Sequence, residues 1–205
     1  MSQLLMPKLA DFSTDAPVRY FEGAPQGYRY DSSKGNFNVN GEINITASKD
    51  HLSILPLAMR HFDAPELFKI KGKQWIELFF LNEVGNVCSL NFHGFSVLRF
   101  FEIVKKKLFY DATQAQICDV IWIFKPTAKT MQKVINGETN TISFHILDFS
   151  YKLINPKLKS ELQIIRDSLS LYNSETARFE TLYSENYGLP LEVISELPTG
   201  EGEKA

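Results

Sequence analysis

The chain has 205 residues, of which 44% are hydrophobic, 22% charged and 13% aromatic, and its formal net charge is −2. These values are typical of one large globular domain, or of one domain with appendages. The chain has no apolar run long enough for a signal peptide or a membrane-spanning helix, and it has only two cysteines, so the sequence favours a cytoplasmic protein over a membrane or disulfide-bonded secreted one.

Charge is distributed unevenly along the chain. Residues 55–159 hold fourteen Lys/Arg against nine Asp/Glu, whereas residues 160–205 hold three against nine. A basic middle attracts polyanions, and an acidic end is able to compete for such a surface. The alternative interpretation is that the acidic end is only a solvated helix and tail.

The first fifty residues predict an arm that carries a β-hairpin. Turn-forming residues within residues 1–35 and a cluster of four aromatics at 20–30 indicate a segment that packs on the rest of the protein. Alternating apolar residues then flank Asn40-Gly41, and this dipeptide is a strong hairpin signal because type I′ turns need positive φ at both central positions. The four aromatics are Tyr20, Phe21, Tyr28 and Tyr30.

Residues 51–155 predict the core, with five strands and one helix. Pro56 interrupts the first strand and favours an edge or a bulge, and Ser96 is the expected N-cap of the helix. The order strand, strand, strand, helix, strand, strand is that of the small oligonucleotide-binding (OB) barrel. A competing interpretation is an α+β sandwich that uses the first hairpin as extra strands. The predicted strands cover 51–59, 74–81, 87–93, 117–130 and 141–154.

The C-terminal part predicts helices at 156–190 that pack on this core, followed by a flexible acidic tail at 191–205. Pro156 suits the first turn of a helix, and a second, short helix is expected from Ser174 to Tyr187. The predicted fold class is therefore mainly β: a β-rich α+β protein with an OB-like barrel, an N-terminal hairpin arm and C-terminal helices.

Known catalytic and metal-binding motifs are absent from the sequence. It contains no phosphate-binding glycine loop, no nucleophile elbow and no H-E-x-x-H pair. The residues that come nearest to a metal-binding set are Cys88, His93, Cys118 and His145. They lack the close spacing of metal ligands, so we predict that they are buried thiols and ordinary histidines. We therefore predict no metal, no cofactor and no catalytic residue, although paired carboxylates need no motif and leave an enzyme as an alternative.

Basic and aromatic residues alternate in two places along the predicted core. Three lysines at 69–73 lead into Trp75 and Phe79, and Trp122 and Phe124 lead into further lysines. Such surfaces hold single-stranded nucleic acid, because lysines follow the phosphates and aromatic rings stack on the bases. The alternative is that both faces of these strands are buried, one in the barrel and one under the N-terminal arm or the C-terminal helices.

The basic, barrel-like middle followed by an acidic end resembles the single-stranded DNA-binding proteins of bacteria and their phages. The resemblance covers residues 51–205 by architecture and charge. In those families an OB-fold core binds the strand, and an acidic tail recruits replication and repair partners. This chain ends Gly-Glu-Lys-Ala, without the terminal acidic run and aromatic cap of those tails. By position, the resemblance implies contacts from Lys71, Lys73, Trp75, Phe79, Trp122, Phe124, Lys125 and Lys129.

The leading hypothesis is a non-catalytic protein that binds single-stranded DNA or RNA by electrostatic capture and base stacking, with no membrane association. This hypothesis also allows protein partners that bind the acidic C-terminal region, and it allows the chain to form a homo-oligomer. The rival hypothesis is a protein-interaction or structural module whose aromatics lie in the core or at a subunit interface. A third is an enzyme with a site built from scattered residues.

Overall fold

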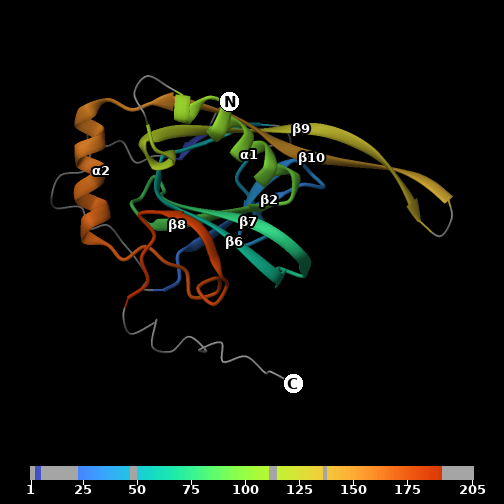
Figure 1. The fold of residues 1–205 in the computed structure, drawn as a ribbon, viewed down its shortest axis with the longest axis horizontal. Coiled ribbons are helices and arrows are strands. Elements are labelled where there is room, and N and C mark those ends of the chain that lie inside the picture. Colours follow the sequence, from blue (N-terminus) through green and yellow to red (C-terminus); the bar gives the residue numbers. More distant parts are fainter. Residues whose placement is uncertain (1–2, 6–22, 47–49, 111–114, 136–137, 191–205) are drawn as a thin grey trace.

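The computed structural model describes residues 3–5, 23–46, 50–110, 115–135 and 138–190 (Figure 1). Within these ranges the chain is mainly β, with its strands arranged in two sheets and two α-helices packed against them. Neither helix combines the length and apolarity needed to cross a bilayer. The predicted tail at 191–205 lies outside the described residues, as do residues 1–2, 6–22 and 47–49 of the predicted N-terminal arm.

The larger sheet has seven strands in the order β11-β6-β7-β8-β2-β3-β4. The predicted Asn40-Gly41 hairpin is confirmed, since φ is 54° at Asn40 and 83° at Gly41 and the turn joins β3 to β4. This hairpin extends the sheet, as the sandwich alternative expects. The strands are β2 (Gln26–Asp31), β3 (Asn36–Val39), β4 (Ile43–Asn44), β6 (Pro56–Leu67), β7 (Ile70–Leu81), β8 (Val87–His93) and β11 (Thr181–Glu185).

The smaller sheet has four strands in the order β1-β5-β9-β10. Its strand β5 leads directly into β6, so one bent stretch of chain contributes to both sheets. The bend falls at Pro56, where the pairing with β7 shifts register, as predicted for a proline that cannot donate a ladder hydrogen bond. The strands are β1 (Gln3–Leu5), β5 (Leu52–Ile54), β9 (Val120–Ile135) and β10 (Glu138–Leu153).

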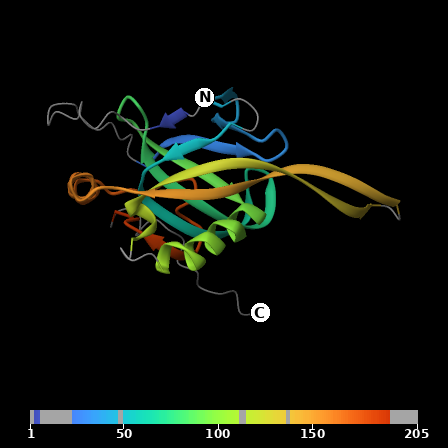
Figure 2. The same ribbon diagram turned by 90° about the horizontal axis from the view of Figure 1, so that it is seen from above.

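The two sheets stay open along β10, where helix α1 (Phe95–Lys106) takes the place of a strand (Figure 2). Ser96 Oγ accepts a hydrogen bond from the Leu147 N–H at 3.1 Å, and Arg99 Nε donates to Asp148 at 3.1 Å. The predicted helix is confirmed, but Ser96 is not its N-cap, because its hydroxyl binds β10 and Gly94 occupies the cap position. No strand pairing in the described residues closes a barrel.

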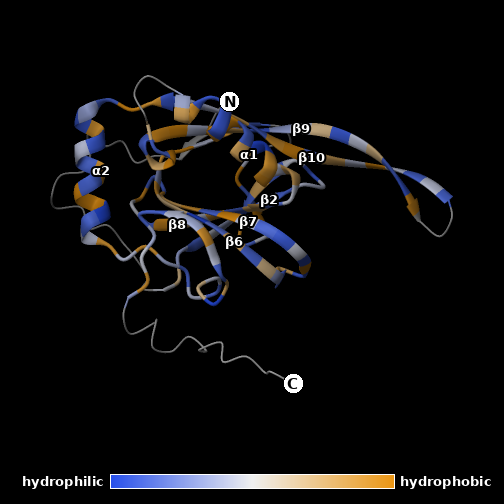
Figure 3. Ribbon diagram, in the orientation of Figure 1, coloured by the Kyte–Doolittle hydropathy of each residue, from blue (hydrophilic) through white to orange (hydrophobic). Residues whose placement is uncertain are grey.

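An aromatic cluster fills the space between the sheets and under α1, where apolar residues concentrate (Figure 3). Phe100 contacts Trp122 with ring centroids 4.7 Å apart, and Phe149 lies 5.5 Å from both Phe92 and Phe124. Burying one such ring contributes about 1.5–3 kcal/mol, so this cluster is a major source of stability.

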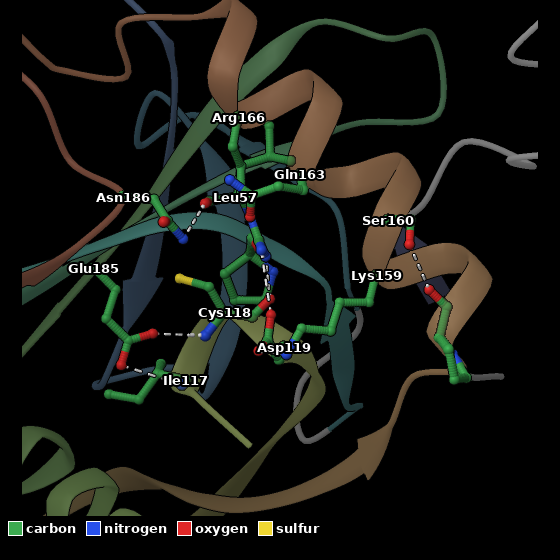
Figure 4. A network of polar contacts seen from close by, with 12 residues as sticks. Leu57, Ile117, Cys118, Asp119, Lys159, Ser160, Gln163, Arg166, Glu185 and Asn186 are labelled. Atoms are coloured by element: carbon green, nitrogen blue, oxygen red, sulfur yellow. Dashed lines mark hydrogen bonds and ion pairs between the residues drawn. The ribbon is translucent and has the colours of Figure 1, made fainter. Parts of the chain in front are cut away.

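Helix α2 (Pro156–Ser168) begins at Pro156 as predicted, with the Asn155 side chain accepting from the Leu158 N–H. A buried ion pair fixes the helix to the core: Arg166 lies 3.2 Å from Asp119, which also binds Lys159 at 2.6 Å (Figure 4). Asp119 ends a short 3-10 turn, so β9 begins three residues later than the predicted strand at 117.

The predicted second helix at 174–187 is wrong, because these residues form turns followed by strand β11. The Arg60 guanidinium donates to the backbone carbonyls of Thr176 and Phe179, which a helix would use for its own hydrogen bonds. The side chain of Asn173 also accepts from the Glu175 N–H at 3.0 Å and holds a turn. Residues 171–180 therefore lie over the outer face of the larger sheet, and β11 then continues the chain as its edge strand beside β6.

Glu77 is the centre of the polar network beneath this C-terminal segment. Its carboxylate is fully buried and accepts hydrogen bonds from Thr176 Oγ1 and Asn173 Nδ2, each at 2.7 Å. Burial raises the pKa of Glu77, while these two donors and the nearby Arg60 oppose the shift. Because a buried charge without partners is costly, Glu77 holds the segment in place.

We predict that Thr176→Val destabilises the protein by about 1.5–3 kcal/mol, because it removes a hydrogen bond to a buried charged group without changing side-chain shape. Urea unfolding followed by tryptophan fluorescence measures the change. Thr139→Val, at an exposed position of β10, is the control and is expected to leave stability unchanged. Equal stability of the two variants would contradict this role for Glu77.

Candidate nucleic-acid interface

Two lysine-bearing hairpins project from the same side of the molecule. The β9–β10 hairpin extends well beyond the sheets, and the β6–β7 hairpin points the same way in both views (Figures 1 and 2). Exposed lysines line both: Lys69, Lys71 and Lys73 at the start of β7 and its preceding turn, and Lys125, Lys129 and Lys133 along β9.

The four predicted stacking rings are all buried, which corrects their assignment to an exposed surface. Trp122 and Phe124 are 0% exposed and belong to the cluster between the sheets. Trp75 (2% exposed) and Phe79 (0%) point to the outer face of the larger sheet. Phe79 packs 5.9 Å from Tyr187 of the C-terminal segment, and Trp75 packs 5.7 Å from Phe68 in the β6–β7 turn and 4.6 Å from His93. Both faces are therefore buried at these rings, as the alternative interpretation expects.

The four predicted lysines are exposed, and they differ in their neighbours. Lys71 lies 3.9 Å from Glu66. Lys73, Lys125 and Lys129 make no ion pair with any residue that the structure describes. Lys125 lies opposite Asp148 in the β9–β10 register, but Asp148 pairs with Arg99.

A cleft of about 130 Å³ lies where the two hairpins meet the body of the protein. The cleft separates the end of β8 and the start of α1 from β10. The two sheets are open on this side of the molecule. Lys73 reaches it from β7, and Phe144, directly opposite Lys129 in the β9–β10 pairing, lines its other wall. Its main side chains are Tyr30, Lys73, His93, Phe95, Phe144 and His145.

An aromatic pair lies at this cleft, with one ring exposed and the other half-buried. Phe95 and Phe144 stack with ring centroids 6.1 Å apart and planes 26° apart, and Phe95 is 59% exposed. Gly94, with φ of 64°, turns the chain sharply between β8 and α1 and directs Phe95 away from the core. A large ring that remains exposed beside a stacked partner offers a flat face to a planar ligand.

Three polar atoms of the cleft are buried and lack a hydrogen-bond partner among the described residues: Tyr30 Oη, His93 Nδ1 and His145 Nδ1. The backbone of His145 is fixed, since its backbone N–H donates a hydrogen bond to the Ser32 carbonyl at 2.7 Å. Gly35 packs so closely against its ring that an added Cβ would approach it to 2.7 Å. Together with the Lys73 ammonium, the cleft presents donors that suit an oxygen-rich anion such as phosphate.

The pKa of His93 lies below its ordinary value, first because the imidazole is buried and second because Lys73 is close. His93 is therefore neutral at pH 7. In the unfolded chain it binds a proton more readily, so the free energy of unfolding falls as the pH drops below about 6.5. An anion in the cleft would favour the protonated ring and raise this pKa.

Sequence analysis missed Phe95, Phe144 and the two histidines of the cleft. One signal was present: Phe95 falls off the buried stripe of its helix, which runs through Val97, Phe100 and Val104. Phe144 likewise falls off the alternation of β10, whose buried residues are Leu147 and Phe149. An aromatic residue that falls outside the periodic pattern of the buried positions is expected to point away from the core.

The predicted absence of a metal site is not contradicted by the described residues, in which no group of His, Cys, Asp or Glu is arranged to hold a metal ion. Both thiols are buried, and burial raises the pKa of Cys88 to about 12 and that of Cys118 well above its ordinary value. Neither thiol is therefore a thiolate at neutral pH, and neither serves as a nucleophile.

Comparison of the chain with protein-family models, curated proteins and solved structures finds no significant match in any of the three. The function is therefore argued from the geometry of the cleft and its two hairpins.

We predict that Lys73→Ala raises the pKa of His93 but leaves it below 6.5, since burial is the larger cause of the shift. An NMR titration of the imidazole measures this, and Lys157→Ala on α2 serves as a distant lysine control. A His93 pKa that does not move would show that the Lys73 ammonium does not reach the cleft.

Proposed function

We propose that this protein binds single-stranded nucleic acid, with DNA as the first candidate, along the cleft between its two lysine-bearing hairpins. The observation that carries the proposal is the Phe95–Phe144 pair, with the Phe95 ring exposed, beside Lys73 and Lys129. Lysines on both hairpins follow the phosphates, and the pair supplies a stacking face for one base. The role in replication or repair that the family resemblance implies is part of this proposal.

The order of strand pairing supports an OB-type core. The bent β5–β6 stretch pairs with β7 and with β9, β7 pairs with β8, β9 pairs with β10, and α1 lies between β8 and β9 in the chain. In the OB fold, nucleic acid binds across strands 2 and 3, between the loops that join strands 1 to 2 and 4 to 5. In this chain those loops are the tips of the two lysine-bearing hairpins.

The proposed contact surface differs from the one that the sequence predicted. The central outer face of β7 is covered by residues 171–180 and Tyr187, so the proposed path runs at the open edge between β8 and β10. The proposal keeps the four lysines Lys71, Lys73, Lys125 and Lys129 and replaces the four buried rings with Phe95 and Phe144. His93, His145 and Tyr30 are assigned to one phosphate.

Protein–protein interaction is a second candidate function. The burial of Trp75, Phe79, Trp122 and Phe124 is the arrangement that this hypothesis expected, and it removes the rings on which base stacking was first based. Both functions are compatible in one chain if they use different surfaces. Direct binding measurements with an oligonucleotide separate them.

We predict that Phe95→Ala weakens binding of a fluorescein-labelled oligo-dT strand by roughly 5- to 150-fold, the loss of one stacked base at about 1–3 kcal/mol. Fluorescence anisotropy at low salt measures the affinity. Tyr110→Ala removes another exposed ring outside the cleft, 85% exposed, and is expected to bind as the unaltered chain does. Equal affinity of all three proteins would remove Phe95 from the interface.

We predict that affinity falls with salt, and that Lys73→Ala and Lys129→Ala each reduce the slope of log K against log [salt] by about 0.7, the value for one phosphate contact to a single strand. Lys157→Ala, whose side chain is 88% exposed on α2, is the matched control and leaves the slope unchanged. An unaltered chain that fails to bind oligo-dT and oligo-rU even at low salt would refute the proposed function.

A further inference from the structure

Helix α1 carries an exposed apolar side chain on the side that points away from the core. Val97, Phe100 and Val104 face inward, whereas Leu98 on the opposite side is 62% exposed. Just beyond the helix, Phe109 is 53% exposed. A surface helix normally presents polar residues to water, so Leu98 and Phe109 together mark a candidate contact face of α1.

This face forms one wall of a groove of about 650 Å³. The facing wall comes from Tyr183 of β11 and His61 of β6, and the half-buried ring of Phe101 lies between them, 4.8 Å from the His61 ring. The volume is within the range of about 300–1,000 Å³ found for ligand sites, and the lining is mainly apolar. Several side chains of a bound segment fit such a groove.

The charge at the rim is positive. Lys105 and Lys106 line the groove, and Glu102, the one acidic residue lining it, is held by Arg99 at 2.5 Å and by Lys106 at 2.8 Å. Lys105 is exposed and makes no ion pair within the described part of the chain. Burial lowers the pKa of His61, so that ring adds no charge at pH 7.

We propose that the groove along α1 docks an acidic amphipathic helix of a partner protein. Apolar side chains of the partner contact Leu98, Phe101 and Phe109, and its acidic residues pair with Lys105 and Lys106. This is the helix-in-groove mode, in which residues at i, i+3, i+4 and i+7 fill an apolar channel. The groove lies against the middle and C-terminal end of α1, whereas the nucleic-acid cleft lies at its N-terminus. The inference does not depend on the proposed nucleic-acid function.

The test uses two labelled helical peptides of about sixteen residues that share leucines at i, i+3, i+4 and i+7. One peptide has glutamates on its polar face and the other has lysines. The full chain is expected to bind the acidic peptide at least roughly fivefold more tightly than the basic one. The double variant Lys105→Glu and Lys106→Glu is expected to reverse this preference. Leu98→Ser and Phe109→Ser are expected to weaken binding of the acidic peptide. Ile164→Ser, at an equally exposed apolar position on α2 (71% exposed), is the control.

Equal affinity for the two peptides, or binding that Leu98→Ser and Phe109→Ser leave unchanged, would overturn the proposal. Two further measurements identify other occupants, and either positive result would also overturn it. Removal of residues 191–205 would raise peptide affinity by about tenfold or more if the chain's own C-terminal segment held the groove. Sedimentation would show a dimer that Leu98→Ser converts to a monomer if a second copy held it.

Discussion

The arrangement of the whole outer surface depends on one buried carboxylate. Glu77 lies in the middle of the larger sheet, and its hydrogen bonds to Asn173 and Thr176 bring the C-terminal segment across that sheet. Arg60, on the neighbouring strand, binds carbonyls of the same segment. Because a buried charge must keep its partners, the segment is fixed there. The rings of Phe79 and Trp75 lie in two further buried clusters on this face.

Covering that face leaves the edge between the two sheets as the accessible part of the fold. The bent strand at Pro56 separates the sheets, and α1 lies where a strand pairing would otherwise join β8 to β10. The consequence is a small cleft, open to solvent, at the root of two projecting hairpins. At this edge the exposed lysines of the two hairpins lie beside the Phe95–Phe144 pair, whereas Trp75, Phe79, Trp122 and Phe124 of the neighbouring strands are buried.

Helix α1 connects the two proposed surfaces. Its buried stripe anchors it to the aromatic core, its first residue, Phe95, contributes to the cleft, and its outer face with Leu98 lines the apolar groove. A ligand at either site therefore contacts the same rigid element. A nucleic acid and a protein partner would lie side by side along one helix without competing for the same side chains.

The sequence by itself determined the local structure. Periodicity and turn chemistry predicted the Asn40-Gly41 hairpin, the β7–β8 hairpin, α1 and the start of α2 at Pro156, because these depend on backbone preferences and on which neighbouring residues are apolar. It also identified the exposed lysines.

Only the tertiary structure decided which face of each strand is covered. Alternation along β7 separates its two faces but does not say what packs on either, and the cover comes from residues about a hundred positions later in the chain. For the same reason the segment after Ser174 is a turn and a strand although its composition suits a helix, and Phe95 and Phe144 form a pair that neither stretch of sequence reveals alone.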